Sequence, residues 1–278
     1  MARLPFGVSR FDGQIGGGAP SGSVVLLAGS AGAGAREFIY TSTVFNGMLK
    51  DDPELFDLHY GDLGPDVEPP EEIHYVSFSA SRGDVSREIT FSMDNEIVAA
   101  GLSGVTFADL SAEYFQLSPV PREWYADDPR SLAELGETTD RRSVIQAFAD
   151  YLDEHASDSL VIVDSLTDLV GDQQRERPWA DVVYLLKGLR KATREWDGLV
   201  LLHLSRDAIT ETEFGELMAC VDGTVQFSWE TGGNERVRTM FVQEFRGVLS
   251  QLEEEDIVRF ETEIHEAGFD VSNVRKIR

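Results

Sequence analysis

Residues 23–36 read Ser-Val-Val-Leu-Leu-Ala-Gly-Ser-Ala-Gly-Ala-Gly-Ala-Arg, and this stretch decides the fold of the chain. The apolar run over residues 23–28 predicts a buried strand, the glycines predict a turn, and a helix is expected to begin near Glu37. Such a turn leaves successive backbone N–H groups unpaired beside the positive end of a helix dipole. This part of the chain is therefore suited to bind a phosphate group.

The glycines have the spacing of a P-loop, G-x-x-x-x-G-K-[ST], from Gly29 to Gly34. Ala35 stands where that motif has the lysine that reaches the β- and γ-phosphates. Arg36 stands where it has the serine or threonine that holds Mg²⁺. The sequence thus predicts a degenerate nucleotide site at Gly29, Ser30, Ala31, Gly32, Ala33, Gly34, Ala35 and Arg36.

The chain is strongly acidic. Its 278 residues include 50 Asp and Glu against 24 Lys and Arg, which gives a formal net charge of -26. Lysine is nearly absent, since it occurs only at Lys50, Lys187, Lys191 and Lys276. This balance predicts a protein of a salt-loving organism, because salt screens the repulsion between charges over a Debye length of about 3 Å at 1 M. An ordinary acidic protein is the alternative.

The composition also argues against several classes of function. Nonspecific DNA binding needs a basic face to neutralise phosphates, so DNA is an unfavoured partner. The single Cys220 rules out an internal disulfide and a cysteine cluster for zinc. The first residues lack the apolar segment of a signal peptide, and no stretch approaches the ~20 apolar residues of a membrane span. We therefore expect a cytoplasmic protein without membrane contact.

Apolar runs and helical periodicity alternate along the rest of the chain. Strands are expected at residues 73–78, 105–110, 159–166, 199–204 and 236–245, with a short strand inside 217–227 and a hairpin around Gly268 over 257–277. Helices are expected at residues 37–50, 84–100, 143–154 and 178–196, loops at 4–22 and 171–177, and surface insertions at 51–72 and 111–140. The pattern predicts one α/β domain over residues 1–278: a mostly parallel central sheet flanked by helices, with antiparallel C-terminal strands.

Residues 7–38, GVSRFDGQIGGGAPSGSVVLLAGSAGAGAREF, resemble the opening of KaiC-like proteins of the RecA superfamily. Those proteins carry a Gly-Ile/Val…Leu-Asp…Gly-Gly-Gly-Ile-Pro-x-Gly segment directly before the P-loop. The matching residues are Gly7, Val8, Asp12, Gly16, Gly17, Gly18, Pro20 and Gly22. The resemblance extends over most of the chain and implies a RecA-like domain, ATP and Mg²⁺ as ligands, and protein partners that include further copies of the chain.

The apolar run at residues 159–166 contains Asp164, which stands where P-loop NTPases place the acid that holds Mg²⁺ through water. By resemblance, residues 161–165 are the Walker B strand of the KaiC-like group, with Asp164 and Ser165 at its end. Asp164 is the residue expected to hold Mg²⁺ if a nucleotide binds.

Two further family positions have lost their chemistry. KaiC-like ATPases carry Glu-Glu just past the second strand, where one glutamate polarises water, and the matching residues here are Ser79 and Ala80. Neither is a useful general base at neutral pH. The family also carries Lys-x-Arg-Gly, which reaches the γ-phosphate of the neighbouring subunit. Here Glu244 replaces that lysine, whereas Arg246 is retained.

Other residues are weaker candidates. His203 is expected to be a core or strand-end histidine rather than a catalyst, and Ser205 and Arg206 follow it where the family places the nucleotide. Trp124 and Tyr125 are either an anchor for a partner or aromatics that hold the insertion to the domain. The basic residues 275–278 read as a solvated tail.

These observations predict a degenerate KaiC-like protein that does not hydrolyse ATP and acts in regulation or signalling through protein contacts. The resemblance implies that class loosely, because a fold does not fix a function. Two alternatives stay open: a working ATPase that uses Arg36 or a partner's residues, and a recombinase-accessory module that binds DNA. For the loop itself, two interpretations without hydrolysis are compatible with the sequence: a turn kept only between strand and helix, or a site that binds nucleotide without hydrolysing it.

Overall fold

The computed structural model describes residues 2–116, 118–125, 143–170, 178–232, 235–249, 252 and 257–276. The strands are β1 (Arg3–Leu4), β2 (Ala19–Pro20), β3 (Ser23–Gly29), β4 (Ile73–Ser77), β5 (Val105–Asp109), β6 (Leu160–Asp164), β7 (Leu199–Ser205), β8 (Gly223–Gly232), β9 (Glu235–Phe245), β10 (Ile257–His265) and β11 (Gly268–Lys276). The helices are α1 (Ser9–Gln14), α2 (Ala35–Asp51), α3 (Pro53–His59), α4 (Arg82–Ser92), α5 (Asn95–Ser103), α6 (Ser111–Phe115), α7 (Val144–His155), α8 (Leu166–Val170), α9 (Pro178–Trp196) and α10 (Glu211–Met218), with 3-10 turns η1 (Arg122–Trp124) and η2 (Arg206–Ala208).

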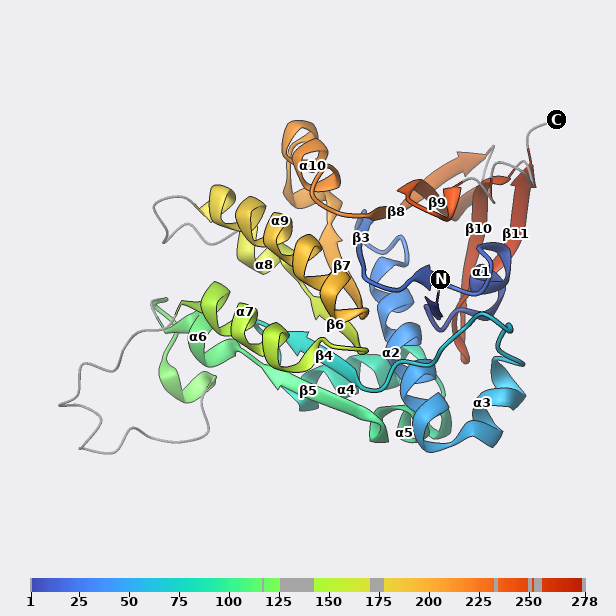
Figure 1. The fold of residues 1–278 in the computed structure, drawn as a ribbon, viewed down its shortest axis with the longest axis horizontal. Helices are drawn as coiled ribbons and strands as arrows, with labels where there is room; N and C mark the ends of the chain where they lie inside the picture. Colours follow the sequence, from blue (N-terminus) through green and yellow to red (C-terminus); the bar gives the residue numbers. More distant parts are fainter. Residues whose placement is uncertain are drawn as a thin grey trace.

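The main sheet has nine strands in the order β11-β10-β9-β8-β3-β7-β6-β4-β5 (Figure 1). The six strands from β8 to β5 in this order pair in parallel, and β9, β10 and β11 continue the sheet as antiparallel strands. This confirms the predicted mostly parallel α/β sheet with antiparallel C-terminal strands. Because the parallel strands run in one direction, their carboxyl ends share one edge of the sheet, which is where ligands bind in open α/β folds.

Helices cover both faces of the parallel strands (Figure 1). On one face, alternate residues of β3 such as Val25 and Leu27 pack against α2, α4 and α5. On the other face, Val24 and Leu26 pack against α7, α8, α9 and α10. Successive side chains of a strand point to opposite faces, so a strand buried on both faces must be apolar throughout. This explains the uninterrupted apolar runs at β3, β6 and β7.

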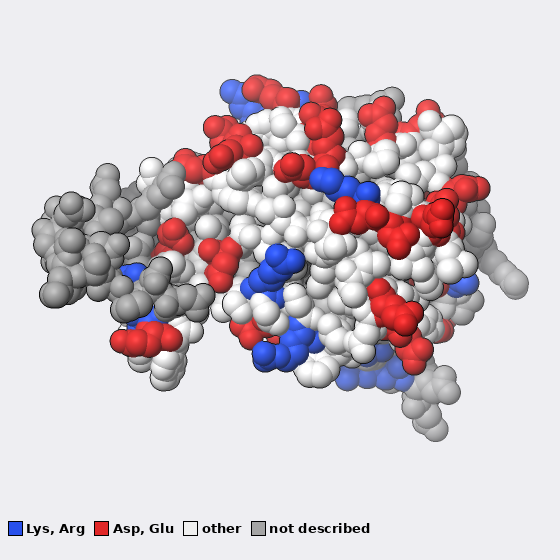
Figure 2. Space-filling view, turned by 90° about the horizontal axis from the view of Figure 1, so that it is seen from below, with Lys and Arg blue, Asp and Glu red and all other residues white. Residues whose placement is uncertain are grey.

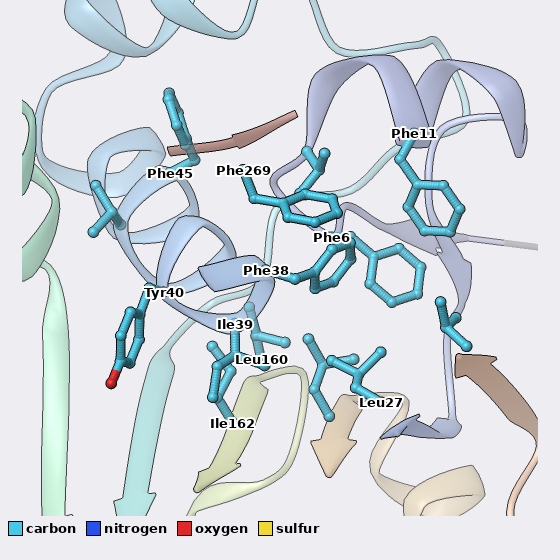
Figure 3. Packing of buried hydrophobic residues seen from close by; sticks show 14 of the residues in the cluster. Phe6, Phe11, Leu27, Phe38, Ile39, Tyr40, Phe45, Leu160, Ile162 and Phe269 are labelled. Carbon is cyan, nitrogen blue, oxygen red and sulfur yellow. The ribbon is translucent and has the colours of Figure 1, made fainter. Parts of the chain in front are cut away.

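A cluster of phenylalanines ties the N-terminal segment to the sheet and to α2. The rings of Phe6, Phe11, Phe38, Phe227 and Phe269 form six contacts with centroids 5.3 to 5.8 Å apart. Four of these rings lie side by side between α1 and the start of α2 in Figure 3. Aromatic pairs at such distances add stabilisation beyond their buried area. The helix that follows the glycine-rich turn is therefore fixed by a core that needs no ligand.

The prediction of a loop over residues 4–22 is wrong, because this segment holds β1, α1 and β2. Asp12 on α1 makes this structure possible. Its buried carboxylate accepts hydrogen bonds from the backbone N–H groups of Phe6, Gly7 and Val8, at 2.9, 2.9 and 3.1 Å, and from the Tyr60 hydroxyl at 2.9 Å. The Asp12 side chain thus pairs the backbone N–H groups of a tight turn. The glycine and proline content of the segment, on which the loop prediction rested, does not reveal such a contact.

Three other element boundaries also differ from the prediction. The helix expected at 84–100 is two helices, α4 and α5, because the chain is extended at Met93 and Asp94, and the Asp94 carboxylate caps α5. The insertion at 51–72 contains α3, which Asp52 caps and whose Phe56 is buried. Helix α10 and the long β8 occupy a region for which only a short strand was expected.

The insertion at 111–140 begins with α6 and η1, and its remaining part, 126–140, lies outside the described residues, as do 171–177. Among the residues that the structure does describe, no helix is long and apolar enough to cross a membrane. On the face shown in Figure 2, acidic side chains are spread widely and basic side chains form a few small groups.

Candidate functional site

The glycine-rich loop lies at the carboxyl edge of the parallel strands. Gly29 ends β3 opposite Ser205 of β7, and Asp164 ends β6 opposite Ser77 of β4. The predicted loop and the predicted Walker B acid are therefore brought to the same edge. A cavity of about 320 Å³ lies over the loop, lined by Gly29, Ser30, Ala31, Gly32, Gly34, Ala35, Arg36, Glu37, His203 and Ser205.

The glycines of the loop are required by the backbone itself. Gly32 and Gly34 have φ angles of 70° and 109°, which side-chain-bearing residues rarely adopt. A Cβ on Gly29 would lie 2.6 Å from the Cβ of Ala35, so the first turn of α2 packs directly on the end of β3. The turn is thus explained by strand-to-helix packing, whether or not a phosphate binds.

Polar groups of the loop are bonded to side chains of the same chain. The Asp207 carboxylate accepts the N–H of Ala31 at 3.0 Å and the hydroxyl of Ser30 at 3.4 Å. The Trp229 indole donates to the Ala31 carbonyl at 3.1 Å, and Arg238 donates to the Gly32 carbonyl at 3.0 Å. Asp207 therefore presents an anionic oxygen to the loop, as a phosphate would.

Arg36 extends from the first turn of α2 toward Asp164, the predicted Walker B acid. Its guanidinium lies 3.4 Å from Oδ1 of Asp164 and 3.8 Å from a carboxylate oxygen of Glu88, which also accepts the Tyr40 hydroxyl at 2.5 Å. In P-loop NTPases a serine or threonine at the place of Arg36 holds a magnesium ion together with the Walker B acid. In this chain Arg36 itself places a positive charge beside Asp164.

Asp164 has donors on both carboxylate oxygens. His203 contacts Oδ1 at 2.9 Å, and the Tyr75 hydroxyl donates to Oδ2 at 2.7 Å. Burial acts to raise the pKa of Asp164, but the hydrogen bond and charge of His203, the charge of Arg36 and the Tyr75 hydrogen bond outweigh it and hold the pKa below its ordinary value. The carboxylate is therefore ionised and paired within the fold.

This set of contacts does not fit a magnesium-bound nucleotide. An acid that holds Mg²⁺ through water must accept a hydrogen bond from a metal-bound water, whereas three donors already face the oxygens of Asp164 and leave about one acceptor site. The cationic guanidinium of Arg36 lies 3.4 Å from this carboxylate and would repel a metal ion there, and Ala35 has no charge to place on a phosphate. Binding would require at least Arg36 to leave Asp164 and Asp207 to leave the loop.

A carboxylate that was not predicted lies beside Ser79, at the position where the resemblance implies a general base. Ser79 donates to Oδ2 of Asp168 at 3.3 Å, and the backbone N–H of Ser165 lies 3.4 Å from the same oxygen. Burial raises the pKa of Asp168, and the negative charge of Asp164 adds to the rise. Ala80 bonds only through its backbone, whose N–H donates to the Ser77 hydroxyl at 3.0 Å.

The residues expected to act on a neighbouring subunit lie away from the loop, Glu244 at the level of the middle of β3 and Arg246 near the level of its start. Glu244 pairs with Thr224 in the β8–β9 register, near the start of β8. Arg246 follows β9, is half-exposed, and lies 3.9 Å from the Asp222 carboxylate, which also binds Arg190 at 2.9 Å. Neither residue faces the loop of its own chain.

The weaker candidates separate into two groups. His203 is buried and bonded to Asp164, and Ser205 lines the cavity, so both belong to the loop site. Arg206 turns away from it, because its guanidinium lies over the Phe214 ring at 4.4 Å and donates to the Ile209 carbonyl at 3.0 Å. Trp124 is 79% exposed, so it does not hold its insertion to the domain.

Asp207, Asp168 and Tyr75 were not predicted from the sequence, although each contacts a predicted site residue. Asp168 lies four residues after Asp164, and this nearness in the sequence was the available signal. Asp207 and Tyr75 come from other strands or their ends, and only the sheet register places them beside the loop and Asp164.

No protein-family model matches the chain, and no curated protein matches it either. Among solved structures, a KaiC-like protein of the hyperthermophilic archaeon Pyrococcus horikoshii OT3 is similar in fold, with a TM-score of 0.61. The alignment covers 98% of this chain and 99% of that protein at 17% sequence identity. The chain therefore has the fold of a KaiC-like, RecA-type protein over nearly its whole length.

Proposed function

We propose that this chain is a degenerate KaiC-like protein of the RecA superfamily that does not hydrolyse ATP and acts in regulation or signalling through protein contacts. The contact between Arg36 and Asp164 carries the proposal. An active site of this class must keep its Walker B acid available for a metal ion, and here the chain's own arginine takes that place.

Three sequence changes support the same function independently. Ala35 gives no cation for the phosphates, Ser79 gives no general base, and Glu244 replaces the lysine expected to act on a neighbouring subunit. A carboxylate that faces a triphosphate repels it, so Glu244 does more than remove an attraction: it adds a repulsion toward a nucleotide bound to a neighbouring subunit.

The direct test is ATP turnover and ATP binding by the full chain in multimolar KCl with Mg²⁺. We expect phosphate release no faster than a protein-free blank, and no calorimetric binding of ATP. An Asp164→Asn variant serves as the matched control, since it removes the acid needed by any magnesium-dependent ATPase. Turnover in the wild type that disappears in this variant would contradict the proposal.

Asp168 favours one alternative, an ATPase that uses Arg36 or residues of a partner. A carboxylate whose pKa is raised by burial lies next to the position of the missing base, and it is within electrostatic reach of Arg36. If turnover is observed, an Asp168→Asn variant decides its origin. Loss of turnover in that variant supports this alternative, and unchanged turnover excludes Asp168 as the base.

We also propose that the protein works in concentrated salt. The net charge of -26 with few lysines produces strong repulsion within the folded chain at low ionic strength. The melting temperature should rise steeply between low and multimolar KCl. A melting temperature independent of KCl would remove this inference.

A further inference from the structure

A second polar cluster lies at the amino end of the parallel strands, opposite to the loop site. Glu72 directly precedes β4, His74 is the second residue of β4, and His155 is the last residue of α7. One ligand atom from each of the three side chains lies within 4.8 Å of the other two. Residues far apart in the sequence thus bring two imidazoles and one carboxylate together.

The central imidazole of this cluster is held by its surroundings. His74 is 1% exposed, and its Nδ1 lies 2.7 Å from the Tyr151 hydroxyl. Its Nε2 points to the carboxylate of Glu72 at 3.0 Å. The His155 ring stacks on the His74 ring with centroids 5.2 Å apart and planes 28° apart. A fixed ring with a bonded Nδ1 is the arrangement that orients metal-binding histidines in proteins.

We propose that Glu72, His74 and His155 bind one divalent transition-metal ion of the zinc class. The ion would replace the contact between Nε2 of His74 and Glu72: with the ring proton on Nδ1, where Tyr151 accepts it, the Nε2 lone pair binds the ion, and the Glu72 carboxylate is its second ligand. Imidazole and carboxylate together suit Zn²⁺, Co²⁺ or Ni²⁺, whereas Mg²⁺ and Ca²⁺ prefer oxygen ligands alone. Water completes the coordination, as in other sites with three protein ligands.

Small side-chain movements bring the three ligand atoms to bonding distance. Ligand atoms around a tetrahedral zinc ion lie about 3.3 Å apart, which follows from metal–ligand distances of about 2.0 to 2.1 Å. Glu72 is 56% exposed and His155 is 34% exposed, so both side chains reach solvent and can turn toward the ion, His155 by shifting its ring on His74 and Tyr151. The buried His74 stays in place and serves as the fixed point.

This site does not depend on the proposed function of the loop. Ile73 starts β4 opposite Leu160, which starts β6, so the cluster lies at the strand ends farthest from Gly29 and Asp164. The ion would link the start of β4 to the end of α7. Metal binding should therefore stabilise the fold without any effect of ATP.

The test is a titration of the full chain with Zn²⁺ in multimolar KCl and excess Mg²⁺, which saturates adventitious carboxylate sites. Calorimetry should show one site per chain and a raised melting temperature. Glu72→Gln alters an exposed side chain and His155→Ala a partly exposed one outside the core, so both should fold, and each should weaken Zn²⁺ binding by at least tenfold. Co²⁺ should give a visible absorption spectrum in the wild type that is lost in His155→Ala.

His265→Ala is the matched control, because His265 also lies beside a glutamate, Glu263 at 3.4 Å, with both side chains about half-exposed. It should leave Zn²⁺ binding unchanged. A Tyr151→Phe variant should weaken binding more mildly, through the loss of the contact to His74 Nδ1. The proposal is overturned if the wild type shows no stoichiometric site, or if His155→Ala binds Zn²⁺ as tightly as His265→Ala does.

Discussion

Asp12 and Asp164 are two inward-facing carboxylates that the fold holds in opposite ways. Asp12 accepts hydrogen bonds from three backbone N–H groups and the Tyr60 hydroxyl, all of them neutral donors. Burial raises its pKa to about 7, although these donors act to lower it. Asp164 is nearly as buried but contacts Arg36 and His203, and its pKa is held below the ordinary value.

The difference separates a carboxylate that organises a turn of the fold from one whose charge is paired with cationic side chains. Asp12 completes the hydrogen bonds of its own turn, so its task is finished when the chain folds. Asp164 carries a charge that must be balanced by a cation, and the chain supplies one from position 36. In a metal-dependent protein with this fold, a bound metal ion would instead supply the balancing positive charge.

Replacing Asp12 should have the largest effect on stability. Asp12→Ala leaves three buried N–H groups and the Tyr60 hydroxyl without their acceptor, so we expect a loss of about 4 kcal/mol in the free energy of unfolding. Urea unfolding in multimolar KCl measures it. Asp94→Ala is the control, because Asp94 also accepts two backbone N–H groups but is exposed, and it should cost about 1 kcal/mol. Equal losses in the two variants would contradict the role given to Asp12.

The pH dependence of stability should carry the opposite sign for the two carboxylates. Between the unfolded pKa of 3.8 and the folded pKa of about 7, the folded state keeps the Asp12 proton that the unfolded state releases. The contribution of Asp12 to stability is thus present below pH 3.8 and is lost as pH rises toward 7, by about 4 kcal/mol.

The Asp12→Asn variant isolates this contribution, since asparagine does not titrate in this range. The wild-type free energy of unfolding minus that of the variant should fall as pH rises from 4 to 7.5, as measured by urea unfolding at each pH. A difference that is constant or increases with pH would show that Asp12 is ionised throughout.

Most of the fold could be predicted from the sequence, because burial on both faces leaves a simple mark. Residues 24–28, 160–163 and 199–204 contain no polar side chain except His203, and their strands form the centre of the sheet. The segment 4–22 could not be predicted in the same way. Its α1 contains Gly13 and depends on the Asp12 carboxylate. Hydrophobic periodicity gives no signal for hydrogen bonds between a side chain and the backbone.

The site could be predicted only in part. The spacing of Gly29 and Gly34 and the strand-ending Asp164 located the edge of the sheet, and the register confirms that they share it. The partner of Arg36 could not be foreseen, because its distance to Asp164 depends on how α2 packs beside β6. The same reason hid Asp207, which reaches the loop from the turn after β7.

Removing Arg36 from Asp164 and restoring the P-loop lysine and hydroxyl should strengthen the binding of ATP. The Ala35→Lys, Arg36→Thr double variant supplies a cation for the phosphates and a hydroxyl for Mg²⁺, and it frees Asp164. We expect ATP affinity to rise at least tenfold, about 1.4 kcal/mol. Adding Asp207→Ala should increase it further, because the Ala31 N–H loses its internal acceptor. Calorimetry with Mg²⁺ measures both steps, and a folded double variant without ATP binding would show that the loop is a structural turn only.

The smallest effect should come from removing Arg36 alone, because its guanidinium is about half-exposed and solvent weakens its attraction to Asp164. Arg36→Ala should cost about 1 kcal/mol at pH 7. The low folded pKa of Asp164 contributes stability that is present above pH 3.8 and lost as pH falls through that lowered pKa. Without Arg36 this pKa rises, so acid unfolding should begin at a higher pH. Arg87→Ala is the control, since Arg87 pairs with the exposed Asp84 and should leave the acid transition in place. If Arg36→Ala also leaves it in place, His203 and Tyr75 hold the charge of Asp164 without the arginine, and the internal cation is not what closes the site.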